Sequence, residues 1–302
     1  MPESSALTAV LKRDRLVVIT ALVAVIAACW IYILAGAGMG MSAFQMTAMS
    51  AKPAGMAETG DETPGTGEGD MPGMAMDGGS SGAMQDMVMT ALAPMAWTPG
   101  YAVLLFFMWW IMMMAMMLPS AAPMILLFAM INRKQREKGA PYVPTAIFAT
   151  GYVLVWGAFS VVAVAAQWGL ERSGLLSSMM ASTSVMLGAG LLIAAGVYQL
   201  TPLKHACLRH CRSPIFFITH HWRSGELGAL RIGVEHGAFC IGCCWFLMAL
   251  LFYGGVMNLF WIVGLAVFVL LEKTIPAGHW LGRIVGALLI AWGGALVLVV
   301  VP

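Results

Sequence analysis

The sequence predicts an all-α, polytopic membrane protein: a helical bundle with about seven transmembrane helices and one disordered, methionine-rich loop. Of its 302 residues, 60% are hydrophobic and only 10% are charged, whereas soluble domains carry about 25% charged residues. Apolar runs of about 20 residues, long enough to cross a bilayer, recur along the chain. The net charge of +2 gives no indication of nucleic-acid binding.

Three parts follow from this pattern. Residues 1–36 form a polar tail and a signal-anchor span, 37–99 a methionine- and glycine-rich loop, and 100–302 a six-span membrane domain that contains a Cys/His segment, 201–244. The first apolar run is too long for a signal peptide and no small-residue cleavage site follows a short apolar core, so we expect it to remain as an anchor. The expected spans are 16–35, 101–131, 145–169, 184–200, 237–256, one that ends at Lys273, and 284–301.

The loop at 37–99 is rich in Gly, Pro, Ser, Thr and acidic residues, which cannot bury a core, so we expect disorder. A disordered composition does not explain the methionines of this loop, which recur as Met71-Pro-Gly-Met-Ala-Met. Thioethers suit Cu(I). The pattern therefore indicates weak copper collection, with low-complexity drift as the alternative.

The span at 101–131 carries methionines at intervals of four: one set of three forms a column on one helix face, and Met113 and Met117 form a second column. Such a column, Met108, Met112 and Met116, could pass Cu(I) between equivalent thioethers. Methionine also fills gaps in packed helices, so packing alone is the alternative. Pro119 and Pro123 should kink this span.

The Cys/His segment is the expected centre of chemistry, because residues 198–248 hold five of the six cysteines and five of the six histidines. Helical periodicity places four of them, His236, Cys240, Cys243 and Cys244, on one stripe about 100° wide. Cys207 and Cys211 lie one turn apart, and His205 comes just before them. Thiolate and imidazole are ligands of Cu(I) and Zn. The alternative is that these cysteines are small hydrophobic residues in a core.

Other parts of the segment are expected to be less important. His220 and His221 read as solvated or interfacial side chains in a stretch too polar to cross a membrane. We expect the following span to begin near Gly237, so that Cys240 lies close to a helix start.

The positive charges orient the spans. With the N-terminus in the cytoplasm, the outer segments hold only Lys52 and Arg172, and the inner segments hold all the other cations. Few charges are expected inside the spans. The loop at 37–99 would then lie outside the cytoplasm and the Cys/His segment inside. The inner residues are Lys12, Arg13, Arg15, Arg133, Lys134, Arg136, Lys138, Lys204, Arg209, Arg212, Arg223, Arg231, Lys273 and Arg283.

Two motifs, Cys207-Leu-Arg-His-Cys and His236-Gly-Ala-Phe-Cys-Ile-Gly-Cys-Cys-Trp, resemble those of a bacterial family of predicted metal-binding integral membrane proteins. The resemblance covers about residues 102–275, and some members of that family are labelled copper chaperones. It implies a set of metal candidates: Cys207, Cys211, His236, Cys240, Cys243 and Cys244.

The leading hypothesis is therefore binding of a soft metal, Cu(I) or alternatively zinc, with trafficking or transport at the bacterial inner membrane. Its partners would be membrane lipid, a copper chaperone or cuproprotein, and further copies of the chain. A thiol–disulfide redox protein that uses Cys207/Cys211 or Cys240/Cys243 is one alternative, and an assembly subunit with a structural metal is another. No ATPase motif and no Ser/His/Asp-type catalytic signature is present, so we do not expect an enzyme.

Overall fold

The computed structural model describes residues 3–51, 97–137, 139, 143–177 and 180–300. Every regular element in these ranges is a helix, which confirms the predicted all-α fold for this part of the chain. The methionines at positions 56, 71, 74, 76, 84, 87 and 89 lie outside the described residues. The helices are α1 (Glu3–Leu34), α2 (Ala43–Ala51), α4 (Pro99–Glu137), α5 (Thr145–Arg172), α6 (Val185–Leu200), α7 (Pro202–Arg212), α8 (Pro214–His221), α9 (Gly225–Ala249), α10 (Leu251–Gly254), α11 (Leu259–Thr274) and α12 (Gly278–Val300).

Five of the described helical segments are long and apolar enough to cross a bilayer, and a sixth span arises if α6 and α7, which meet at a bend of 65°, form one broken span. The predicted number of about seven is not confirmed, because α6 and α11 have only 16 residues each and a span needs about 20. The five segments are Arg15–Leu34, Pro99–Gln135, Thr145–Arg172, Gly225–Gly254 and Gly278–Val300.

Two helix pairs pack through glycines that let their backbones touch, as is common in membrane proteins. In the α5–α9 pair, a Cβ built on Gly151 would lie 2.3 Å from the Leu230 carbonyl oxygen, and one on Gly233 would lie 2.1 Å from that of Phe148. In the α6–α12 pair, a Cβ on Gly196 would lie 2.6 Å from the Gly286 carbonyl oxygen. The first of these crossings fixes α9, which holds three of the six cysteines, against α5.

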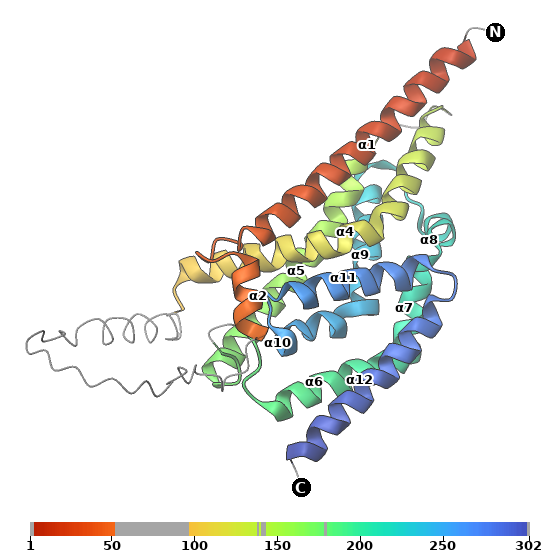
Figure 1. The fold of residues 1–302 in the computed structure, drawn as a ribbon. Helices are drawn as coiled ribbons and strands as arrows, with labels where there is room; N and C mark the ends of the chain where they lie inside the picture. The colour runs from red at the N-terminus through yellow and green to blue at the C-terminus, as the bar shows by residue number, and fades with distance from the viewer. Residues whose placement is uncertain (1–2, 52–96, 138, 140–142, 178–179, 301–302) are drawn as a thin grey trace, which may run out of the picture.

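The loop predicted at 37–99 begins with a helix rather than with disordered chain. α2 packs against α1 and α11, and its residue Met46 is buried. Thr47 Oγ1 accepts a hydrogen bond from the backbone N–H of Leu259, the first residue of α11, at 3.0 Å. The apolar positions of α2 therefore find a core to bury against. α2 lies at the end of the bundle opposite α7 and α8 (Figure 1).

The start of α9 differs from the prediction. The helix begins at Gly225, not near Gly237, so Cys240 lies in its middle rather than at its start. Its first three turns carry Glu226, Arg231 and Glu235 among apolar residues and glycines, and Glu235 pairs with Arg231 at 3.1 Å and with Arg223 at 3.4 Å. A hydropathy pattern locates only the continuous apolar part of such a helix, so the start was predicted too late in the chain.

Gly233→Ala tests the α5–α9 crossing. The added methyl would overlap a backbone oxygen that cannot turn away, so the two helices must separate. We expect a loss of about 1–3 kcal/mol or more in the free energy of unfolding, measured by thermal unfolding in detergent. Gly190→Ala is the matched control, because a Cβ there meets nothing within 4 Å. Equal unfolding temperatures for the two variants would contradict the close crossing.

Candidate functional site

The buried face of α9 carries the four residues that helical periodicity placed on one stripe. His236, Cys240, Cys243 and Cys244 are each at most 3% exposed. Cys211 of α7 is also buried, and its thiol interacts with the side chains of Cys240 and Cys243. All these cysteines are free thiols. We call Cys211, Cys240, Cys243 and Cys244 the thiol cluster.

The sequence of α7 determines where the helix begins and which face it buries. Thr201 caps it, with Oγ1 accepting from the backbone N–H of Lys204 at 3.3 Å, and Pro202 follows in the first turn, where its missing N–H costs nothing. Its buried residues, Lys204, Leu208 and Cys211, recur at intervals of four and three and define one inward face. The Cys207 thiol is only partly buried and lies over Gly242 of α9, where a Cβ would be 2.7 Å from its sulfur.

Two polar groups from other helices contact the Cys240 thiol, and a third holds one of them in place. Lys273 Nζ of α11 lies 2.9 Å from Cys240 Sγ and 3.1 Å from the Ser120 hydroxyl of α4. The Tyr152 hydroxyl of α5 lies 3.1 Å from the same sulfur. An ammonium beside a sulfur favours the thiolate form of that sulfur. Helices α4, α5, α9 and α11 thus meet at Cys240.

The other two thiols of α9 turn toward their own backbone. Cys243 Sγ and Cys244 Sγ both donate to the Cys240 carbonyl oxygen, at 3.1 and 3.0 Å. Cys244 Sγ also lies 4.0 Å from Met117 Sδ of α4. In this arrangement, no three His, Cys, Asp or Glu side chains among the described residues converge to hold a metal ion. Rotation of thiols about their Cα–Cβ bonds would be needed for them to act as joint ligands.

His236 lies one turn before Cys240 between aromatic rings. Its ring stacks with Tyr152 at 5.6 Å and Phe148 at 6.2 Å between centroids. Its Nδ1 is buried and has no hydrogen-bond partner in the described structure. Buried polar atoms are usually satisfied, so an unpartnered imidazole nitrogen next to a set of thiols fits a soft or borderline metal as cargo.

A buried ion pair joins α7 to α11. Lys204 Nζ and Glu272 Oε1 are 2.6 Å apart, with side chains 0% and 2% exposed. Together with Lys273 they place three charged side chains in the interior of the bundle, and they remove Lys204 and Lys273 from the loop cations used for orientation. Glu272 and Lys273 are neighbours in sequence and point about 100° apart around the helix, so α11 contacts both the ion pair and the thiol cluster.

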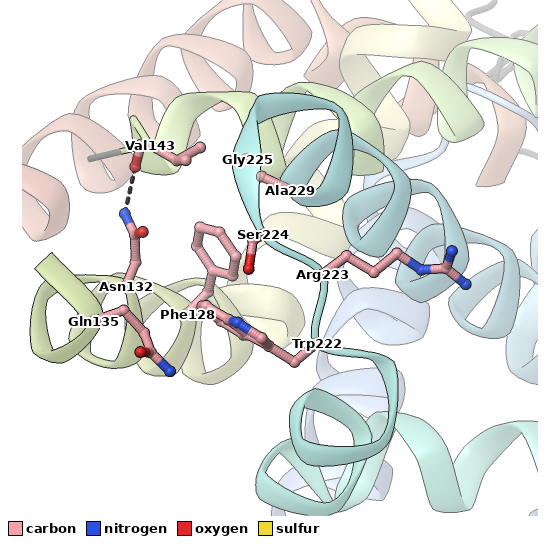
Figure 2. Close-up of a pocket in the computed structure, with 9 residues that line it drawn as sticks. All are labelled: Phe128, Asn132, Gln135, Val143, Trp222, Arg223, Ser224, Gly225 and Ala229. Carbon is pink, nitrogen blue, oxygen red and sulfur yellow. Dashed lines mark hydrogen bonds between the residues drawn. The ribbon is translucent and has the colours of Figure 1, made fainter. Parts of the chain in front are cut away.

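A small pocket lies between the end of α4 and the start of α9 (Figure 2). Its volume is about 40 Å³, which suits a few water molecules. Phe128 and Trp222 form apolar walls, Asn132 donates to the Val143 carbonyl, and Arg223 points away. No cysteine or histidine lines it, so it is not the soft-metal site.

The structure separates the predicted site residues into groups. His205 lies on α7 among Arg283, Lys204 and His279 rather than at the thiol cluster. Met108, Met112 and Met116 are all buried, but the methionine that touches the cluster is Met117. Sequence reasoning placed Met117 in a methionine column and Lys273 among the inner cations, but put neither at the thiols. It missed Tyr152 and Ser120.

Comparison with known proteins gives one match. A family model, PpoB2, described as a copper chaperone, matches residues 106–296, more than half of the chain. The match runs from α4 into α12 and therefore includes every residue of the thiol cluster. Neither the curated proteins nor the solved structures contain a significant match.

Glu272→Gln tests the buried ion pair. It leaves the Lys204 ammonium buried without a counter-charge, which we expect to cost about 3–5 kcal/mol in stability, measured by thermal unfolding in detergent. The double variant Lys204→Met/Glu272→Leu removes both charges and should regain most of that loss. A Glu272→Gln variant as stable as the native chain would contradict a desolvated pair.

Proposed function

The chain belongs to the PpoB2 copper chaperone family, and from this premise we propose that its thiol cluster binds Cu(I) and passes it to a partner protein at the bacterial inner membrane. One observation supports this most: four buried cysteines from α7 and α9 lie together, and one of them, Cys244, contacts Met117. Thiolates and thioethers are the ligands that Cu(I) prefers. Zinc, which takes a closed set of four N, S or O ligands, is the alternative cargo.

Lys273 gives the proposed site a suitable charge. Cu(I) held by two thiolates has a net charge of −1, which is costly to bury in an apolar bundle. The ammonium beside Cys240 would neutralise it. The nearby Lys204–Glu272 pair sums to zero and leaves this balance unchanged. Lys273 therefore acts in the proposal as a counter-ion and not as a ligand.

The methionines of α4 support a relay toward the cluster. Met108, Met112 and Met116 lie on one face of the helix and are buried with Met113 and Met117, and Met117 touches Cys244. We propose that thioethers carry Cu(I) along α4 to the thiols. Under the positive-inside orientation, the relay begins outside the cytoplasm and the thiols lie toward the reducing side.

Burial weakens the thiol–disulfide alternative. Exchange needs an accessible sulfur that a partner thiolate can attack, and of the six cysteines, all of them described, only Cys207 is more than slightly exposed. A structural metal remains distinguishable by release: a chaperone yields its copper to a chelator while still folded, whereas a structural metal leaves only on unfolding.

Cys243→Ser tests the site. We expect its Cu(I) affinity to fall at least about tenfold, because a serine hydroxyl is a poor ligand for Cu(I). Metal content per chain, measured by mass spectrometry on anaerobically purified protein from copper-fed cells, is the readout. Cys29→Ser is the matched control, because Cys29 is also buried but lies in α1. Unchanged copper in Cys243→Ser would refute the proposed site.

Lys273→Met tests the counter-ion. Without the ammonium, the copper bis-thiolate would be a buried anion, so we expect Cu(I) affinity to fall roughly tenfold or more. A competition titration against a chromophoric Cu(I) chelator measures it. Lys273→Arg keeps the charge and should retain most of the affinity. Native affinity in Lys273→Met would show that Lys273 does not balance the bound metal.

A further inference from the structure

Two histidines outside the thiol cluster lie close together at the junction of α7 and α8, with their ring planes at 76° to each other. The ring centroids of His210 on α7 and His221, the last residue of α8, are 6.2 Å apart. Both side chains are partly exposed. The sequence pattern predicts solvated surface for His221, but the fold of α8 back onto α7 pairs it with His210.

Hydrogen bonds fix the tautomer of both rings. His210 Nδ1 lies 2.9 Å from the Ala206 carbonyl oxygen and His221 Nδ1 lies 3.0 Å from that of Phe217. A carbonyl oxygen only accepts, so Nδ1 carries the hydrogen in both. The lone pair is then on Nε2 of each neutral ring, which is the usual arrangement of a metal-ligating histidine.

Aromatic rings hold both imidazoles in place. Phe239 stacks on His210 at 4.1 Å with an interplanar angle of 6°, and Phe217 stacks on His221 at 4.5 Å and 17°. Each ring is therefore fixed by one hydrogen bond and one stacked face. Ligands held in this way lose little freedom when they bind.

The spacing of the two rings suits one metal ion. A metal about 2.0 Å from each of two imidazole nitrogens separates the ring centres by roughly 5–6.5 Å, the upper end being the linear arrangement. Cu(I) readily accepts two ligands in line. We propose that His210 and His221 form a second, more accessible copper site that holds Cu(I) between their Nε2 atoms.

The position of the histidine pair indicates its role, which rests on the proposed function of the thiol cluster. His210 is followed by Cys211, and Phe239, which stacks on His210, is followed by Cys240. Imidazole is a less soft ligand than thiolate, so the pair binds Cu(I) more weakly. It is an exchange site where copper passes between the buried thiols and a copper-carrying partner.

A competition titration of the purified full chain with Cu(I), under anaerobic conditions and against a chromophoric chelator, tests the pair. The native chain should show two classes of copper-binding site, one tight and one weaker. His210→Phe and His221→Phe keep a stacking ring but remove a ligand, so each should weaken the second class at least about tenfold and leave the tight class unchanged. His220→Phe is the matched control, since His220 has the same Nδ1 hydrogen bond, to Phe216, but is exposed.

Each outcome decides the proposal. An unchanged weaker class in both variants, or an equal loss in His220→Phe, would overturn the histidine site. If the native chain shows the weaker copper site but no tight one, the result contradicts the thiol cluster and supports the histidine site. If the variants do not fold, X-ray absorption of the native chain at the second copper equivalent decides: imidazole nitrogen ligands support the site, and sulfur alone refutes it.

Discussion

The contact between the Lys273 ammonium and the Cys240 thiol, 2.9 Å apart, is the interaction on which the rest of the site depends. A cation inside an apolar helical bundle is costly unless a partner and hydrogen bonds compensate it. Cys240, Ser120 and, through Cys240, Tyr152 provide that compensation from three different helices. The same requirement brings α4, α5, α9 and α11 together at the point where the other thiols gather.

α11 arranges the charges of the interior. Glu272 turns toward Lys204 of α7, and Lys273 turns toward the thiols. α7 contributes both Lys204 and Cys211, so the ion pair and the thiol cluster share two helices.

Local periodicity was sufficient to predict some of these features. The all-α fold and the shared buried face of His236, Cys240, Cys243 and Cys244 follow from helical spacing alone. The contact of Met117 rather than Met116 with Cys244 depends on the rotation of α4 against α9, which no single-helix pattern contains. Packing between segments also decides two other features. Lys204 and Lys273 are buried by helices distant in sequence, and His210 meets His221 because α8 folds back onto α7. The start of α9 was misplaced because charged residues interrupt the apolar pattern of its first turns.

The central claim is that sulfur from the thiol cluster holds the cargo. X-ray absorption at the copper edge, on anaerobic protein loaded with less than one equivalent, tests it most directly. The account predicts monovalent copper with two or three sulfur neighbours, in line with its preference for soft ligands, and loss of that signal when the four cysteines of the cluster are changed to serine. A first shell of nitrogen and oxygen only, or an unchanged signal without those cysteines, would contradict it.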